Sequence, residues 1–271
     1  MKIKVMQFNI RTGFRIADEP YSLEGKRLEY AKKLINNEKP DILAINEAYF
    51  ESENKSGILV NYQDIFNYPY YTHGNYKGGL SPFWGSAILS KFPIIGSENN
   101  NKGLGGCLRT KIQINDKIIN LDLTHISPIP YLSNKKQEKT IKEIFKKTNK
   151  NYILTGDFNS LSPLDNYNQK EMLNAWSKIF KDANKQIKEM LKRDAVRFVL
   201  SKGLIDSYKE KNKVFEYTIP TDFLSKNKST GIRIDYIFCS KEFKVIDSGI
   251  IKNQLTEKAS DHYPIYAILE I

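Results

Sequence analysis

The sequence predicts an α/β (α+β) fold in which β-sheets are covered by helices. Short segments rich in β-branched and aromatic residues recur along the chain, and stretches with helical periodicity lie between them. No internal repeat, low-complexity tract or Pro/Gly-rich linker divides the chain. With 271 residues and 40% hydrophobic content the chain can bury a large core, so we expect a single domain over residues 1–271.

Strands are predicted wherever β-branched and aromatic residues cluster between turn-forming residues. The Asn115-Asp116 pair lies between two such segments and predicts a hairpin turn, although a tight turn prefers glycine after the aspartate. Part of the sheet is therefore expected to be antiparallel. The predicted strands are residues 3–9, 42–47, 86–89, 108–114, 118–124, 152–155, 234–239 and 265–269.

Helices are predicted from apolar residues at intervals of three and four. The first such pattern is Leu28, Ala31, Leu34 and Ile35, and a second lies in the lysine-rich stretch 134–148, which we interpret as a solvated helix face. The third pattern is long enough for two successive helices, and Gly203 is a suitable stop for the second of them. Its apolar residues are Met172, Leu173, Trp176, Ile179, Phe180, Ala183, Ile187, Met190 and Leu191.

Charge and composition limit the function only broadly. A formal net charge of +11 favours a polyanionic partner such as nucleic acid or an acidic membrane surface, but the lysines are spread over the whole chain. No signal peptide or apolar stretch of membrane-spanning length is visible, so we expect a soluble, unprocessed, cytoplasmic monomer. Cys107 and Cys239 lie in apolar, strand-like runs and are expected to be buried free thiols.

Polar residues that a sheet core does not need occur where the predicted strands begin or end, and strand ends can gather distant side chains at one rim. Carboxylates with few histidines and no cysteine cluster favour a hard cation such as Mg²⁺ over zinc. Of the three histidines in the chain, two fall in this set, and His73 is interpreted as structural or surface. The set is Asn9, Glu47, His125, Asp157, Asn159, Asp235, Asp261 and His262.

These residues lie in short motifs: Phe8-Asn9, residues 40–43 running to Asn46-Glu47, residues 85–90, Leu123-Thr124-His125, Gly156-Asp157-Phe158-Asn159, residues 233–238 and residues 260–264. In this order, and over nearly the whole chain, they resemble the motifs of the endonuclease/exonuclease/phosphatase superfamily, the DNase I-like phosphoesterases. The resemblance rests on the ordered set and not on any single motif. It implies a four-layer sandwich in which two mixed β-sheets pack face to face with helices on the outside.

The resemblance also implies a metal site. Glu47 would be the principal ligand of Mg²⁺, for which Mn²⁺ is a possible substitute. Asn9 would lie beside Glu47, and Asp261 would be a second carboxylate on the metal side.

Further roles follow from the same resemblance. Asp157 would orient or deprotonate the attacking water, and Asn159 would hold the phosphate and nucleophile in line. His262 would contact the scissile phosphate or act as the base, with Asp235 accepting its other ring proton. His125 would donate to a non-bridging oxygen. Such roles are physically reasonable because phosphoryl transfer depends mainly on positioning and on charge stabilisation.

Two classes of substrate remain open. The leading hypothesis is a phosphodiesterase or nuclease acting on nucleic acid. The alternative is a phosphodiesterase or phosphatase acting on a lipid head group, an inositol phosphate or another small ester. A non-catalytic binding module is disfavoured because the whole polar set is present. His125 stands where the abasic-site branch of the superfamily has a tyrosine motif, which argues against a role at abasic sites.

Local features bear weakly on the choice of substrate. Arg11, Arg15, Lys77 and Arg109 are compatible with tracking along a phosphate backbone, and Tyr76 is compatible with stacking on a base. The insertion 162–202 follows the Gly156–Asn159 motif and is expected to form one wall of the active site.

Overall fold

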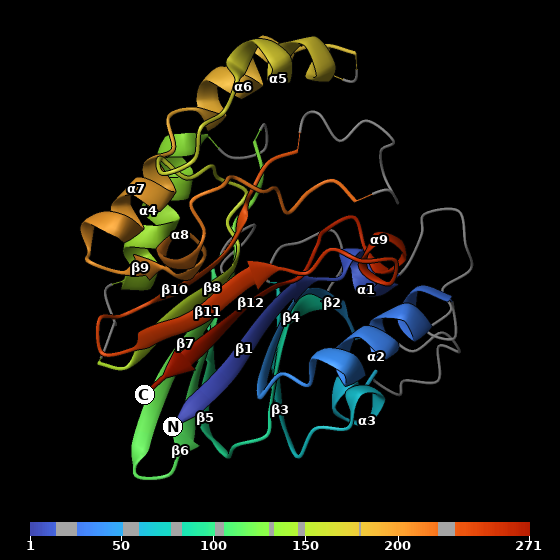
Figure 1. Ribbon diagram of the computed structural model, residues 1–271, viewed down its shortest axis with the longest axis vertical. Coiled ribbons are helices and arrows are strands. Elements are labelled where there is room, and N and C mark those ends of the chain that lie inside the picture. Colours follow the sequence, from blue (N-terminus) through green and yellow to red (C-terminus); the bar gives the residue numbers. More distant parts are fainter. Residues whose placement is uncertain are drawn as a thin grey trace.

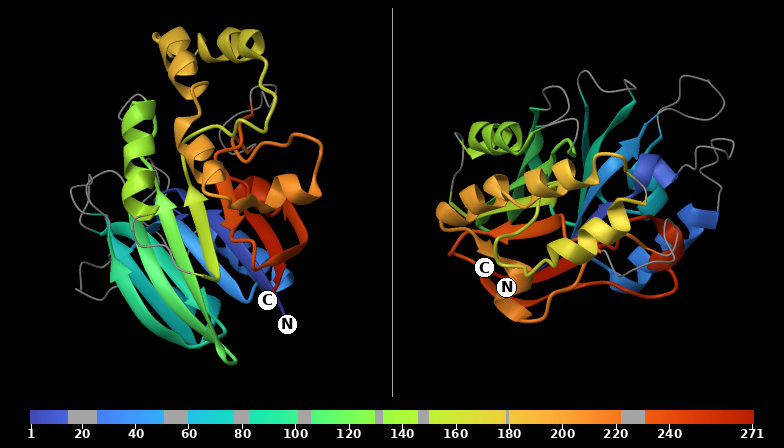
Figure 2. Two further views of the ribbon diagram at one scale, coloured as in Figure 1. Left: turned by 90° about the vertical axis from the view of Figure 1, so that its left-hand side faces the viewer. Right: turned by 90° about the horizontal axis from the view of Figure 1, so that it is seen from above.

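The computed structural model describes residues 1–14, 26–50, 60–76, 83–100, 106–129, 133–145, 150–178, 180–221 and 231–271. Within these ranges the strands form two sheets that pack face to face, with helices outside (Figures 1 and 2). Both sheets are mixed, because β1 with β2 and β7 with β8 run parallel whereas the other pairs are antiparallel. The four-layer sandwich expected from the sequence is confirmed.

The first sheet has the strand order β11-β12-β1-β2-β4-β3 and the second has the order β5-β6-β7-β8-β10-β9. The strands of the first sheet are β1 (Lys2–Asn9), β2 (Ile42–Tyr49), β3 (Tyr70–Asn75), β4 (Trp84–Ser90), β11 (Lys244–Ile250) and β12 (Ile265–Glu270). Those of the second are β5 (Ile94–Asn99), β6 (Cys107–Ile114), β7 (Lys117–His125), β8 (Tyr152–Asp157), β9 (Ile205–Asp206) and β10 (Asp235–Cys239).

Apolar side chains fill the layer between the sheets and the two outer layers. Ile3 and Val5 of β1 face the second sheet, and Met6 and Phe8 of the same strand face the helices on the outside. The first sheet is covered by α2 (Lys26–Glu38), α3 (Tyr62–Phe66) and α9 (Thr256–Ala259), and the second by α4 (Asn134–Phe145) and α7 (Asp194–Ser201). The remaining elements are α1 (Arg11–Phe14), α5 (Gln169–Trp176), α6 (Ala183–Met190) and α8 (Ser207–Lys211).

The periodicity over residues 172–191 predicted two successive helices, and α5 and α6 confirm it. A third helix, α7, which was not predicted, follows them within the insertion. Arg193 has φ +59 and separates α6 from α7, because a left-handed residue cannot continue a right-handed helix. Gly203, with φ +79, therefore follows the third helix and not the second.

Helices α5 and α6 form an arm that projects beyond the ends of the strands (Figure 1, top; Figure 2, left). The base of this arm is tied to the second sheet by a buried ion network. The guanidinium of Arg233, two residues before β10, donates to Asp165 at 2.8 Å and to Asp206 at 2.7 Å. Because each buried charge has a partner, the network holds the arm base beside β10 without an unpaired ion.

Three further features concern the Asn115-Asp116 hairpin, the cysteines and membrane-spanning helices. Ile114 and Lys117 are register partners, so the Asn115-Asp116 hairpin is confirmed. Both cysteines are free and buried, as expected. Among the described residues, no helix has the length and apolar character needed to cross a membrane.

Candidate active site

The polar residues of the site lie in the same layer between the two sheets as the apolar core, at one end of the sandwich. Every second residue of β1 faces the second sheet, so Gln7 and Asn9 continue the series begun by Ile3 and Val5. Gln7 Nε2 donates to Asp235 Oδ1 in the opposite sheet at 3.1 Å. The intersheet layer thus changes from apolar to polar at this end of the sandwich.

Strands of the second sheet follow the same alternation. Leu123 and Ile237 belong to the apolar layer, and His125 and Asp235 lie two positions further towards the rim. Both of these polar residues are register partners of Asp157 on the central strand β8. The pairing therefore brings three predicted site residues level with one another.

Glu47 reaches this rim because β2 contains a bulge. Asn46 faces inward, so an undisturbed strand would turn Glu47 to the opposite face. Glu47 instead has φ +57, and the register with β4 shifts between Ile45 and Ala48. A bulge can redirect a side chain in this way, and Glu47 Oε1 accepts a hydrogen bond from Asn9 Nδ2 at 3.1 Å. The strand continues past Glu47 and does not end there as predicted.

Gly156 allows β8 to approach β7 closely. Its φ of +135 lies in a region that residues with side chains rarely adopt, and a Cβ atom would lie 1.9 Å from Thr124 O. The next residue is Asp157. The glycine of this motif is therefore required by the backbone that places Asp157 level with His125.

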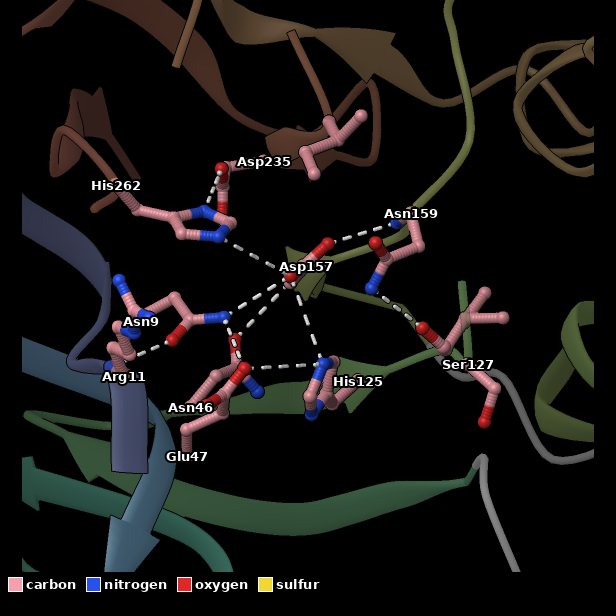
Figure 3. A network of polar contacts seen from close by, with 12 residues as sticks. Asn9, Arg11, Asn46, Glu47, His125, Ser127, Asp157, Asn159, Asp235 and His262 are labelled. Carbon is pink, nitrogen blue, oxygen red and sulfur yellow. Dashed lines mark hydrogen bonds and ion pairs between the residues drawn. The ribbon is translucent and has the colours of Figure 1, made fainter. Parts of the chain in front are cut away.

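Asp157 lies at the centre of the site (Figure 3). Its Oδ2 accepts from Asn9 Nδ2 at 3.0 Å and lies 3.6 Å from His125 Nε2 and 3.9 Å from His262 Nε2. Its Oδ1 accepts from the backbone N–H of Asn159 at 2.8 Å. One buried carboxylate thus faces both imidazoles.

His262 is oriented by a carboxylate from the opposite sheet. His262 Nδ1 lies 2.9 Å from Asp235 Oδ2, and both residues are buried. Since the ionised carboxylate can only accept, Nδ1 carries the proton of this bond. His262 Nε2 is then the ring atom that faces Asp157.

Asn159 is fixed by backbone contacts. It has φ +45, and its Nδ2 donates to Ile126 O at 2.8 Å. Gln137 of α4 donates to both Asn159 O and Ser127 O at 3.0 Å. An amide carries two protons, so one N–H of Asn159 remains for a ligand after the bond to Ile126.

The residues after β1 form a left-handed turn that supports Asn9 and Glu47. Arg11, Thr12, Gly13 and Phe14 all have positive φ, from 41 to 67. The backbone N–H of Arg11 donates to Asn9 Oδ1 and that of Thr12 donates to Glu47 Oε2, each at 3.0 Å. Left-handed backbone costs about 1–2 kcal/mol per non-glycine residue. The strained turn therefore directs two backbone N–H groups at the site.

Burial and neighbouring charges shift the pKa values of His262 and His125 in opposite directions. Burial alone would lower the pKa of His262, but the charges of Asp235 and Asp261 and the hydrogen bond to Asp235 hold this pKa well above its ordinary value. Burial lowers the pKa of His125. Burial, followed by the charge of Asp235, raises the pKa of Asp157 well above its usual range. The site therefore tends to hold a proton on His262 and to keep His125 neutral.

The donor set fits a hard divalent cation. Ligand atoms of Glu47, His125 and Asp157 lie within 4.8 Å of one another, and those of Asp157, Asp235 and His262 form a second such group. Two of the three donors in each group are carboxylate oxygens, which are the ligands that hard divalent cations prefer. Positive charge here would also oppose the repulsion that raises the pKa of Asp157.

Two predicted metal ligands have other contacts in this structure. Asn9 presents its amide N–H to Glu47 and Asp157, while its oxygen accepts from the Arg11 backbone. Asp261 Oδ2 lies 3.7 Å from Arg11 Nη1, and Asp261 Oδ1 accepts from Ser260 Oγ at 3.2 Å. Neither contact excludes metal ligation, and both assignments stay predictions.

Of the basic residues predicted to track phosphate, Arg11 and Arg109 lie within the described part of the chain. Arg109 is wrongly assigned, because its guanidinium makes two hydrogen bonds to the buried Asp122 at 2.9 and 2.6 Å. Arg15 and Lys77 lie outside the described residues. Tyr76 directs its hydroxyl into the site, and its ring packs on His125 with centroids 5.4 Å apart. His73 is exposed on β3 and packs against Phe50, as a structural or surface residue would.

Several supporting residues were not predicted from the sequence. Gln7 and Asn46 could have been found, because they are polar residues at inward positions of buried strands. Thr12 had no such signal, because it acts through its backbone N–H. Tyr76 was named from the sequence only as compatible with base stacking; its hydroxyl contact with His125 was not predicted, because Tyr76 follows a strand that the sequence did not reveal.

Comparison with known proteins identifies the family and the fold of the chain. The family model described as "Endonuclease/Exonuclease/phosphatase family" matches residues 6–262. A protein of that family from Bacteroides thetaiotaomicron has a similar structure, with a TM-score of 0.66, 19% identity, and 99% of this chain and 95% of that chain covered. No curated protein matches the sequence.

Two further solved structures carry functional names. An AP endonuclease from Archaeoglobus fulgidus gives a TM-score of 0.64 at 19% identity, covering 99% of this chain and 100% of the other. A mannosyl-6-phosphatase from Bacteroides thetaiotaomicron gives 0.64 at 21% identity, with the same coverage. At these identities the likeness shows a shared fold.

The sandwich fold and the acidic site with two imidazoles at its rim define a class of enzyme, the metal-dependent hydrolases of phosphate esters. The chain belongs to the endonuclease/exonuclease/phosphatase family, whose model spans nearly all of it.

Proposed function

We propose that the chain is a Mg²⁺-dependent phosphodiesterase that acts on nucleic acid by in-line attack of water, with Mn²⁺ as a substitute metal. The observation that carries this proposal is the convergence of His125 and His262 on Asp157, whose Oδ2 lies within 3.9 Å of both Nε2 atoms. A carboxylate between two imidazoles offers both a proton acceptor and donors for phosphoryl oxygens.

In this proposal Glu47 is the principal metal ligand, with Asn9 beside it and Asp261 as a second carboxylate. When bound, the cation supplies positive charge that stabilises the phosphoryl oxygens as negative charge develops. The left-handed turn supports this set by holding Glu47 through the backbone N–H of Thr12. Asn9 would ligate through Oδ1, so its amide would turn and give up the hydrogen bond from the Arg11 backbone N–H.

Two groups are positioned to take the proton of the attacking water. Asp157 Oδ2 has a pKa raised by burial, which makes it a better base than an ordinary aspartate. His262 Nε2 lies 3.9 Å away, and Asp235 keeps the ring proton on the other nitrogen. If Asp157 is the base, the raised pKa of His262 makes its ring a charged donor to the phosphate.

The remaining side chains hold the phosphate. His125 Nε2 faces the same centre as Asp157 and would donate to a non-bridging oxygen. Asn159 would use its second amide proton to keep the phosphate and the nucleophile in line, because its first is held by Ile126 O.

Support for a nucleic-acid substrate comes from charge. The chain has a net charge of +11, and helices α4 and α6 present exposed lysines on the side of the sandwich that carries the arm. The AP endonuclease with the same fold cleaves nucleic acid according to its name, whereas the named mannosyl-6-phosphatase supports the alternative of a small phosphate ester. A lipid head group or an inositol phosphate belongs to the same alternative.

A substrate panel tests the proposal. Plasmid DNA, single-stranded DNA, RNA, bis(p-nitrophenyl) phosphate, p-nitrophenyl phosphate and sphingomyelin are each incubated with Mg²⁺ or with chelator. We expect metal-dependent cleavage of nucleic acid that weakens as salt is raised. If only the monoester were hydrolysed, the substrate would be a small phosphate ester, and if only sphingomyelin were hydrolysed, it would be a lipid head group. If no substrate of the panel were hydrolysed, the proposal of a phosphodiesterase would be rejected.

A further inference from the structure

The hydroxyl of Tyr76 is hydrogen-bonded to both Glu47 and His125. It accepts from the backbone N–H of Glu47 at 3.2 Å, lies 3.0 Å from Ser86 Oγ and lies 3.1 Å from His125 Nδ1. The ring of Tyr76 is tilted by 58° against the imidazole, with 5.4 Å between the centroids. Both the position and the hydrogen bonding of His125 therefore depend on this one side chain.

The number of protons available restricts which groups donate and which accept around the Tyr76 hydroxyl. A phenol donates one hydrogen bond and accepts two. If Tyr76 donates to His125, it accepts from Glu47 and from Ser86, and Ser86 Oγ accepts from Asn46 Nδ2 at 3.4 Å, so every group has a partner. If Tyr76 instead donates to Ser86, the hydroxyl proton of the fully buried Ser86 has no acceptor among the described residues. The first arrangement satisfies one more buried group.

Charge favours the same arrangement. The other ring atom, His125 Nε2, lies 3.8 Å from Glu47 Oε1 and 3.6 Å from Asp157 Oδ2. A lone pair on Nε2 would be repelled by two carboxylates, whereas an N–H there is attracted to them. The carboxylates therefore favour the tautomer with the proton on Nε2, in which Nδ1 accepts.

We infer that Tyr76 is a positioning residue whose hydroxyl donates to His125 Nδ1 and fixes the tautomer with the proton on Nε2, so that His125 serves the reaction as a donor and not as a base. This inference rests on the proposed function only for its effect on catalysis. The tautomer itself is a property of the free protein.

The tautomer can be read by NMR. In protein labelled with ¹⁵N-histidine, long-range ¹H–¹⁵N correlation at pH 8 distinguishes a protonated from an unprotonated ring nitrogen, and the chain has only three histidines. His73→Gln and His262→Asn assign the other two rings. We expect Nε2–H for His125 in the native chain and a mixture of tautomers in Tyr76→Phe, which keeps the aromatic ring. Ser86→Ala is the matched control, because it removes a neighbour of the hydroxyl but leaves the bond to His125.

Kinetics with bis(p-nitrophenyl) phosphate and Mg²⁺ provide the second readout. Tyr76→Phe should lower kcat about tenfold with little change in KM, as is typical when the partner of a functional imidazole is removed. Native His125 with its proton on Nδ1, an unchanged tautomer in Tyr76→Phe, or a changed tautomer without a fall in kcat would each overturn the inference. If the native chain cleaved no diester, the proposed function would fail, and the NMR result would still decide the tautomer.

Discussion

Asp235 Oδ2 lies 2.9 Å from His262 Nδ1, and this contact joins the two sheets at the rim of the sandwich. Asp235 begins β10 in the second sheet, whereas His262 lies just before β12 in the first. Gln7 of β1 donates to the other oxygen of Asp235. The position of the imidazole therefore depends on the packing of the sheets.

The first prediction concerns the charge of this pair. Asp235→Asn keeps the shape of the side chain but removes the carboxylate that raises the pKa of His262, so this pKa should fall towards or below its ordinary value. We expect kcat on bis(p-nitrophenyl) phosphate to fall about 10²-fold or more. Asp116→Asn, in the exposed hairpin turn, is the control. A variant at Asp235 with more than half of the native kcat would contradict the pairing role.

The second prediction concerns the metal. Mg²⁺ or Mn²⁺ should raise the melting temperature of metal-free protein, because a ligand that binds the folded state stabilises it, by about 2.7 kcal/mol at 100 times its Kd. Glu47→Gln should lose most of this stabilisation as well as the activity.

Glu38→Gln is the matched control, since Glu38 pairs with Lys4 at the opposite end of β1. It should keep the shift caused by the metal. Equal shifts in native protein and Glu47→Gln, measured by differential scanning calorimetry, would remove Glu47 from the metal site.

The strands that the sequence failed to reveal are all at sheet edges. β3 and β11 flank the first sheet, and β5 and β9 flank the second. An edge strand is covered on fewer sides, and β5 accordingly has no buried residue. The apolar signal that identifies a strand is therefore weakest there.

The parts of the site that follow from strand alternation and from the family motifs could be predicted from the sequence. His125 and Asp157 lie in register at the ends of two buried strands, so their meeting follows from the pattern. The bulge at Glu47 and the left-handed turn at Thr12 do not follow, because both need φ values that non-glycine residues rarely adopt. Only the surrounding packing can impose them.

The third prediction compares two glycines with positive φ. Gly156→Ala would place a Cβ atom 1.9 Å from Thr124 O, whereas a Cβ at Gly203 would meet no atom within 4 Å. We expect Gly156→Ala to lower the free energy of unfolding by roughly 3 kcal/mol or more, or to prevent folding, and Gly203→Ala to cost about 1 kcal/mol. Urea unfolding measures both, and similar costs would refute the close approach of β8 to β7.

The fourth prediction concerns the path of a nucleic-acid substrate. A hollow of about 430 Å³ between α4 and α6 is lined by Lys135 and Lys185 and includes Ile129, four residues beyond His125. Glu189 and Lys192, which also line it, pair with each other. If nucleic acid is the substrate, as proposed, we expect Lys135 and Lys185 to contact its phosphate backbone beyond the site.

A double variant, Lys135→Ala with Lys185→Ala, should weaken binding of a catalytically silent chain to single-stranded DNA and reduce the slope of log Kd against log salt by about 0.7 for each lysine that contacts phosphate. Hydrolysis of bis(p-nitrophenyl) phosphate should stay unchanged, because this small diester reaches only the reacting centre. Lys32→Ala with Lys33→Ala removes the same charge from α2, on the outer face of the first sheet. If both double variants reduced the slope of log Kd against log salt equally, net charge alone would attract the DNA. The hollow would then not lie on the path of the substrate.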